Sequence, residues 1–184
     1  MSIRDDIEKV LVTEEEIDSA LSVLAKKINE EYKDKNLLLV GILKGSMPFM
    51  SDLLKRIDLY CKIDFMCVSS YGGGTKSSGR VNILKDLSQP IEGDDVIIIE
   101  DIVDSGHTLA FITDYFKAKN ANSVKICTLL DKPSRRECEI HVDYACFEIE
   151  DEFVVGYGLD YDEKYRNLPH IGVLKPEIYM DNID

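Results

Sequence analysis

An unbroken apolar run, Val96 to Ile99, is followed directly by two carboxylates, Glu100 and Asp101. Apolar β-branched runs of this length are typical of strands buried on both faces in a parallel sheet. We expect the strand to end at these carboxylates and a helix to begin after a short polar turn. Ligands of parallel α/β sheets bind just beyond the carboxyl ends of the strands. The turn residues, 104–108, are therefore predicted to lie at a ligand site.

The turn itself has the composition of an anion-binding loop. The hydroxyls of Ser105 and Thr108, together with the free N–H groups of a starting helix, can hold a phosphate. Two carboxylates beside such a loop would repel an isolated phosphate. A sugar phosphate with bound Mg²⁺ resolves the conflict, because the carboxylates then bind the sugar hydroxyls or the metal.

The rest of the chain alternates strands and helices. Thr13 and Glu16 form a capping box that begins a helix reaching about Glu31. The pattern then predicts a strand at 37–43, a helix at 46–56, strands at 61–67 and 96–100, a helix carrying Leu109, Ile112 and Phe116, and strands at 124–130, 142–149, 153–157 and 171–174. This order predicts a single α/β domain, residues 1–184, with a parallel sheet between helices. We expect the N-terminal helix and the C-terminal segment to form a small cap.

Composition excludes several classes of function. The net charge of −13 disfavours nucleic acid and anionic membranes as partners. Apolar runs stay well short of the roughly 20 residues that cross a bilayer, and the N-terminus has no signal-peptide character, so we expect a cytoplasmic protein. The five cysteines lack a C-x-x-C spacing and are predicted to be buried, reduced thiols. The three histidines lack zinc spacing.

The segment Glu100–Thr108 closely resembles the phosphoribosyl-pyrophosphate (PRPP) signature of the type I phosphoribosyltransferases. Four further segments match in order and point to the hypoxanthine-guanine branch of that family. The resemblance implies a Rossmann-like sheet with a small hood. It also implies an enzyme of purine salvage that joins hypoxanthine and/or guanine to PRPP with Mg²⁺, releasing pyrophosphate and IMP or GMP. Members commonly form homodimers or homotetramers.

The resemblance assigns roles within the signature. Glu100 and Asp101 would hold the ribose hydroxyls and, with Asp160, the Mg²⁺ ions. Asp104 would act as the general base, taking the proton from N7 of the purine. The 5′-phosphate would be bound by Asp104, Ser105, Gly106, His107 and Thr108. Relatives often have another residue where His107 stands, so a charge-based role for its side chain is not expected.

The other matching segments supply the remaining subsites. Lys44 and Gly45, whose peptide bond can be cis in relatives, would bind pyrophosphate together with Arg166. Ser70 and Tyr71 begin a glycine-rich loop that resembles a catalytic lid excluding water. The purine would be bound by Lys132 at its O6, Phe153 by stacking, Val154 through its backbone, and Asp160.

Each of these segments has an ordinary structural explanation when taken alone, such as a tight turn at Gly45 or a core aromatic at Phe153. One alternative function is a regulatory protein on the same fold that binds nucleotides and RNA, which the charge of −13 disfavours. A phosphoacceptor signalling domain is another. In such a domain the acidic pair should follow the first strand, and no Ser-Gly-x-Thr loop should come after it. This sequence meets neither condition. The sequence does not choose among hypoxanthine, guanine and xanthine.

Overall fold

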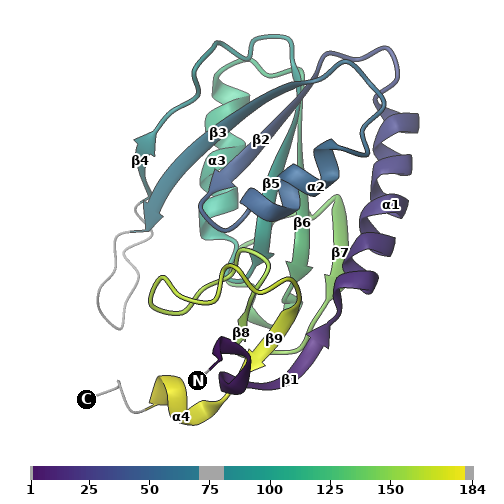
Figure 1. Ribbon diagram of the computed structural model, residues 1–184. Helices are drawn as coiled ribbons and strands as arrows, with labels where there is room; N and C mark the ends of the chain where they lie inside the picture. Colours follow the sequence, from purple (N-terminus) through teal and green to yellow (C-terminus); the bar gives the residue numbers. More distant parts are fainter. Residues whose placement is uncertain (1, 71–80, 181–184) are drawn as a thin grey trace.

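The computed structural model of the chain describes residues 2–70 and 81–180. Its main sheet has strand order β4-β3-β2-β5-β6-β7, and every neighbouring pair is parallel except β3 and β4 (Figure 1). The strands are β2 (Leu37–Leu43), β3 (Lys62–Ser70), β4 (Val81–Lys85), β5 (Asp95–Val103), β6 (Ser123–Asp131) and β7 (Tyr144–Glu148). The predicted parallel α/β fold is confirmed.

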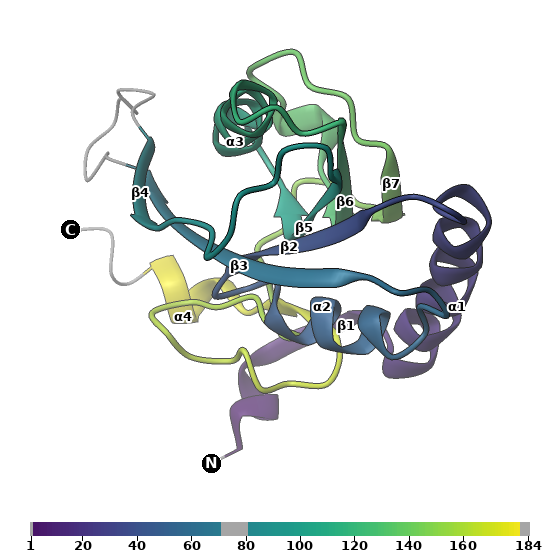
Figure 2. The same ribbon diagram turned by 90° about the horizontal axis from the view of Figure 1, so that it is seen from above.

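Helices cover both faces of this sheet, as expected. α1 (Glu14–Glu31) and α2 (Met47–Leu54) share one buried apolar cluster, and α3 (His107–Ala118) belongs to the cluster on the opposite face (Figure 2). The capping box of α1 is present. The Glu16 N–H donates to Thr13 Oγ1 at 3.2 Å, and the Thr13 N–H donates to the Glu16 carboxylate at 2.8 Å. Two short 3-10 helices also occur: η1 (Ile3–Asp6) and η2 (Pro133–Arg135).

A second, three-stranded sheet forms a hood beside the main sheet. Its order is β1-β9-β8, all antiparallel, from β1 (Ile7–Val12), β8 (Val154–Val155) and β9 (Ile171–Leu174), followed by α4 (Pro176–Met180). The N- and C-terminal segments therefore do build a cap. The expectation that the N-terminal helix contributes to it was wrong. The apolar side of α1 is buried against the main sheet, so the strand before it pairs with β9 instead.

The central strand is longer than predicted. β5 continues through Glu100 and Asp101 to Val103, because β6 still offers it partners: Ile102 pairs with Leu130 and Val103 with Asp131. β8 is shorter than predicted, because Gly156 has a φ of 101° and Tyr157 a φ of 48°, which end the extended conformation.

The structure also bears on membrane-spanning helices and on the state of the cysteines. No helix among the described residues is both long and apolar enough to cross a membrane. The five cysteines are all free thiols, as predicted, but only Cys127 is fully buried and the others are partly exposed.

Candidate active site

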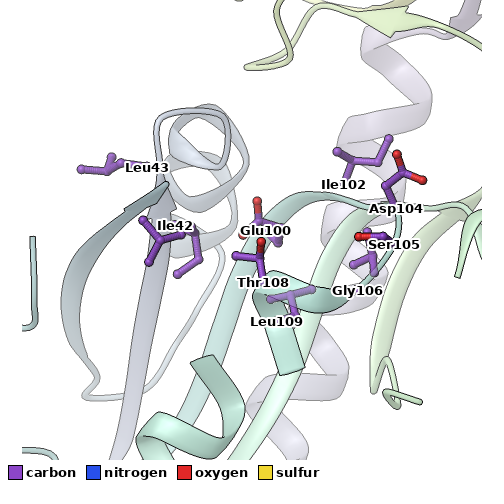
Figure 3. A pocket seen from close by; sticks show the side chains of 11 residues that line it. Ile42, Leu43, Glu100, Ile102, Asp104, Ser105, Gly106, Thr108 and Leu109 are labelled. Atoms are coloured by element: carbon purple, nitrogen blue, oxygen red, sulfur yellow. The ribbon is translucent and has the colours of Figure 1, made fainter. Parts of the chain in front are cut away.

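A pocket opens at the carboxyl ends of the central strands (Figure 3). Ile42 and Leu43 of β2 and Val68 of β3 form one wall, and the other residues come from β5, the β5–α3 loop and the start of α3. These are Glu100, Ile102, Val103, Asp104, Ser105, Gly106, Thr108 and Leu109. The structure thus gathers most of the predicted signature around one pocket, at the edge of the sheet where it was expected.

The β5–α3 loop has the geometry of an anion-binding loop. Gly106 caps α3 with a φ of 88°, and a Cβ there would lie 2.9 Å from Ile140 Cδ1. The first helical bond runs from the Ala110 N–H to the Gly106 carbonyl at 2.9 Å, so the N–H groups before it have no acceptor within the helix. Ser105 and Thr108 line the pocket beside them (Figure 3). A phosphate fits these donors and the positive end of the helix.

The two signature carboxylates are adjacent near the end of β5, where Asp101 is buried and Glu100 is partly buried. Burial raises the pKa of Glu100 well above its usual value, and the adjacent Asp101 charge raises it further. Burial also raises the pKa of Asp101, which is 8% exposed. Within the described residues, Glu100 Oε2 has no hydrogen-bond partner. Sugar hydroxyls or a divalent cation would satisfy these oxygens, so the pair fits the predicted ligand.

Asp104 is accessible and is held by two arginines. Its side chain is 50% exposed, and Arg135 Nε donates to Asp104 Oδ1 at 3.2 Å. Arg136 Nη1 donates to the Asp104 carbonyl at 2.9 Å and also pairs with Asp131. An exposed carboxylate fixed in this way can accept a proton from a ligand in the pocket.

Lys132 lies at the end of β6 and is only 7% exposed. Its Nζ donates to the Glu152 carbonyl at 2.6 Å and lies 3.6 Å from an Asp151 oxygen. The backbone N–H of Lys132 donates to Val103 at 3.0 Å, which ties this segment to the end of β5. A buried ammonium with a carbonyl partner can also donate to a carbonyl of a ligand.

The predicted pyrophosphate residues Lys44 and Arg166 both pair with Glu163, in the loop between β8 and β9. Lys44 Nζ pairs with Glu163 at 2.8 Å, and Arg166 pairs with Asp160 at 2.7 Å. The cis peptide bond of this loop is Leu43–Lys44, one residue before the Lys44–Gly45 bond that the resemblance suggested.

The loop between β8 and β9 closely approaches the loop between β2 and α2 at this point. A Cβ on Gly45 would lie 1.6 Å from Asp101 Oδ2, and one on Gly158 would lie 2.0 Å from the Gly45 carbonyl oxygen. Arg166 Nη1 donates to the Gly158 carbonyl at 2.7 Å. The loop that connects the hood strands β8 and β9 therefore meets the loop after β2 through glycines, which leave room for the backbones to approach.

The three predicted metal ligands are only partly brought together. Glu100 and Asp101 are neighbours, whereas the carboxylate of Asp160 is engaged by Arg166 and by the Glu163 N–H at 2.9 Å. The positive charge of Arg166 also lowers the pKa of Asp101, although less than burial raises it. Across residues 2–70 and 81–180, no three histidine, cysteine or carboxylate side chains are grouped closely enough to hold a metal by themselves.

The predicted purine-binding segment borders the hood. Val154 is buried in β8, and Phe153 is 39% exposed with its ring stacked on Tyr179 of α4. His107 lies at the start of α3 with its Nε2 3.0 Å from a Glu137 oxygen, so its side chain is engaged outside the phosphate loop. Tyr71 of the predicted lid lies outside the described residues, and only the backbone of Ser70, the last residue of β3, is described.

Sequence reasoning missed several residues that shape this site. Arg135 and Arg136 hold Asp104, and a basic cluster in an otherwise acidic chain was the available signal. Glu163 and Tyr179 contact Lys44 and Phe153, respectively. Nothing in their local sequence marks these two residues, because each acts on a partner far away in the chain.

Comparison with known proteins decides the family. Residues 12–162 match the phosphoribosyl transferase domain family. The chain is 58% identical over 177 residues to the hypoxanthine-guanine phosphoribosyltransferase of Streptococcus agalactiae, covering 96% of this chain and 98% of that one. This chain belongs to the hypoxanthine-guanine phosphoribosyltransferase family.

Two other relatives place the chain within that family. A crystal structure of a hypoxanthine phosphoribosyltransferase from Staphylococcus aureus superposes with a TM-score of 0.94 at 55% identity, covering 96% of each chain. The bifunctional protein TilS/HprT of Listeria innocua is 57% identical over 180 residues, which is 98% of this chain but 28% of that relative. The chain therefore spans about a quarter of the bifunctional relatives and nearly the full length of the hypoxanthine-guanine phosphoribosyltransferases that it matches.

Proposed function

We propose that this chain transfers the phosphoribosyl group of PRPP to hypoxanthine and/or guanine, releasing pyrophosphate and IMP or GMP. One observation carries the proposal: the phosphate loop, the buried lysine and the hood segment converge at one edge of the sheet. A buried cationic donor favours a 6-oxo group and disfavours the 6-amino group of adenine.

The substrate subsites follow from the chemistry of the side chains. The 5′-phosphate would bind the N–H groups and hydroxyls of residues 105–108, and the ribose hydroxyls would bind Glu100 and Asp101. Lys44, Gly45 and Arg166 would bind pyrophosphate, with the two cations released in part from Glu163 and Asp160. The purine would lie between Lys132 and Phe153, with the Val154 backbone at its edge.

In the proposed reaction the purine N9 forms a bond to C1 of the ribose, and the bond from C1 to the pyrophosphate oxygen breaks. The proton on N7 of the base passes to Asp104, whose carboxylate is accessible and charge-paired. Bound with PRPP, Mg²⁺ would supply charge neutralisation for the leaving pyrophosphate. PRPP itself would complete the coordination begun by Glu100, Asp101 and Asp160.

The test is pyrophosphate release from PRPP and Mg²⁺ with hypoxanthine, guanine, xanthine and adenine in turn. We expect turnover with hypoxanthine, guanine or both, and none with adenine. Asp114→Asn, an exposed aspartate on α3, is the matched control for Asp104→Asn. Failure of every base to turn over, in a folded protein that binds PRPP, would overturn the proposal and favour the regulatory, RNA-binding alternative.

Three related expectations are part of the same proposal. We propose that residues 1–184 act as one phosphoribosyltransferase domain, that copies of the chain assemble as a homodimer or homotetramer, and that the protein works in the cytoplasm without nucleic acid or membrane partners. Mass measurement in solution would test the assembly directly.

A further inference from the structure

Three aromatic rings meet where the purine-binding segment joins the C-terminal helix. The rings of Phe153 and Tyr179 are stacked, with centroids 4.4 Å apart and planes 14° from parallel. Tyr161 meets Phe153 edge-on at 5.6 Å and 81°, and meets Tyr179 at 6.5 Å and 70°. Both the stacked and the edge-to-face arrangements are favourable for aromatic pairs, so the three rings fix one another.

This arrangement leaves one face of Phe153 available. Tyr179 covers the other face and Tyr161 meets an edge, yet Phe153 remains 39% exposed. Tyr179 itself packs against the apolar cluster of the hood, which includes Val155 and Leu174. Tyr179 therefore lies on the hood side of Phe153.

The backbone also links the two stacked rings. The Leu174 N–H donates to the Phe153 carbonyl at 2.9 Å, and the Lys175 N–H donates to Asp6 at 3.0 Å, directly before α4 begins. The position of α4 relative to Phe153 is thus set by main-chain bonds as well as by stacking. Figure 1 shows α4 beside the hood, next to the N-terminal 3-10 helix.

We propose that Tyr179 is a positioning residue for the purine. Its ring holds the plane of Phe153, so that the open face of Phe153 is already oriented when the base arrives. The inference rests on the proposed function, because it takes Phe153 as the ring on which the base stacks. It assigns to the C-terminal helix a role in binding the base, separate from PRPP and from the chemical step.

The experiment measures steady-state kinetics of Tyr179→Ala, Tyr179→Leu and Tyr179→Phe with hypoxanthine and PRPP varied separately. Met180→Ala is the control, since Met180 is the neighbouring residue of α4 and is exposed. We expect Tyr179→Ala and Tyr179→Leu to raise KM for hypoxanthine about three- to tenfold, the range expected for one aromatic pair. KM for PRPP and kcat should stay within about twofold of wild type, and Tyr179→Phe should restore KM for hypoxanthine.

The outcomes separate this inference from the proposed function. Absence of turnover in the wild-type protein would contradict the proposed function itself. An active wild type with unchanged KM for hypoxanthine in Tyr179→Leu would overturn the inference alone. A lower KM in that variant would also overturn it, because Tyr179 would then occupy the place of the base. Tyr179→Leu retains apolar packing, so it remains informative if Tyr179→Ala does not fold.

Discussion

The two sides of the site are held together in different ways. On the main-sheet side, residues 100–108 form one contiguous segment whose backbone is fixed by the β5–β6 ladder and by donors from residues 132–137. On the hood side, residues from distant parts of the chain meet through ion pairs, stacked rings and glycine contacts. We infer that the two sides affect different kinetic constants. Changes on the sheet side should lower kcat, and changes on the hood side should mainly alter KM.

The largest effect is expected on the sheet side. Asp104→Asn removes the proposed proton acceptor while keeping the shape of the side chain. We expect kcat to fall roughly 10²- to 10⁴-fold, the usual contribution of a general base, with KM for PRPP nearly unchanged. Asp114→Asn should keep wild-type kcat. Similar turnover in both variants would remove Asp104 from the mechanism.

The contact between the two sides is tested by Gly158→Ala. A Cβ there meets the Gly45 carbonyl oxygen at 2.0 Å on a backbone with a φ of 104°. We expect a loss of about 3 kcal/mol or more in the free energy of unfolding, measured by urea denaturation. Gly93→Ala is the matched control, because Gly93 has a φ of 78° but a Cβ placed there would have no neighbour within 4 Å.

The control isolates backbone strain from the steric clash. Gly93→Ala should cost about 1–2 kcal/mol, the penalty of a left-handed conformation alone. Equal losses in the two variants would show that the close approach of hood and sheet is less important than we infer.

Lys132→Ala tests the proposed recognition of the purine. Lys132 contacts both sides of the site, through Val103 of β5 and Glu152 before β8. Removing a charged donor should lower kcat/KM for hypoxanthine roughly ten- to a hundredfold, the value of one hydrogen bond to a charged group. Activity with adenine should not fall in parallel, so the preference for 6-oxopurines weakens. Lys117→Ala, an exposed lysine on α3, serves as the control. Unchanged kinetics with hypoxanthine would count against the assigned role.

The smallest effect is expected far from the pocket. Glu31, at the end of α1, accepts hydrogen bonds from Lys125 of β6 and Tyr144 of β7, which hold its pKa below the usual 4.5. A lowered pKa gives stability that is present above about pH 4.5 and is lost as the pH falls through the lowered value. Glu31→Gln should remove that pH dependence, at a cost under about 1 kcal/mol at pH 7 because the pair is partly exposed. Unfolding measured from pH 7 to 3 would check this.

The same contrast explains how much the sequence could predict. Most strands and helices of the main sheet follow from local patterns, such as the run Val96–Ile99 and the apolar positions of α3, but the edge strand β4 was not predicted. The parallel α/β fold and the family are confirmed. Most signature residues also line the predicted pocket, because they are adjacent along the chain. Their individual roles stay predictions.

The hood was less predictable because its partners are distant. Ile7–Val12 has no clean alternation of buried and exposed residues, and it becomes a strand only by pairing with Ile171–Leu174. The contact of Arg135 with Asp104 likewise depends on how η2 folds back over the β5–α3 loop. Local propensity carries no information about such pairings.

The pairing of β1 with β9 has a consequence for synthesis on the ribosome. β1 is translated well before its partner β9, which ends at Leu174. At ordinary translation rates of about 5–20 residues per second, β1 waits roughly 10–30 s for that partner. During this interval the main sheet can begin to assemble, while the hood of the nascent chain is incomplete. Activity should therefore arise only after β9 has been synthesised, as a late and nearly all-or-none event.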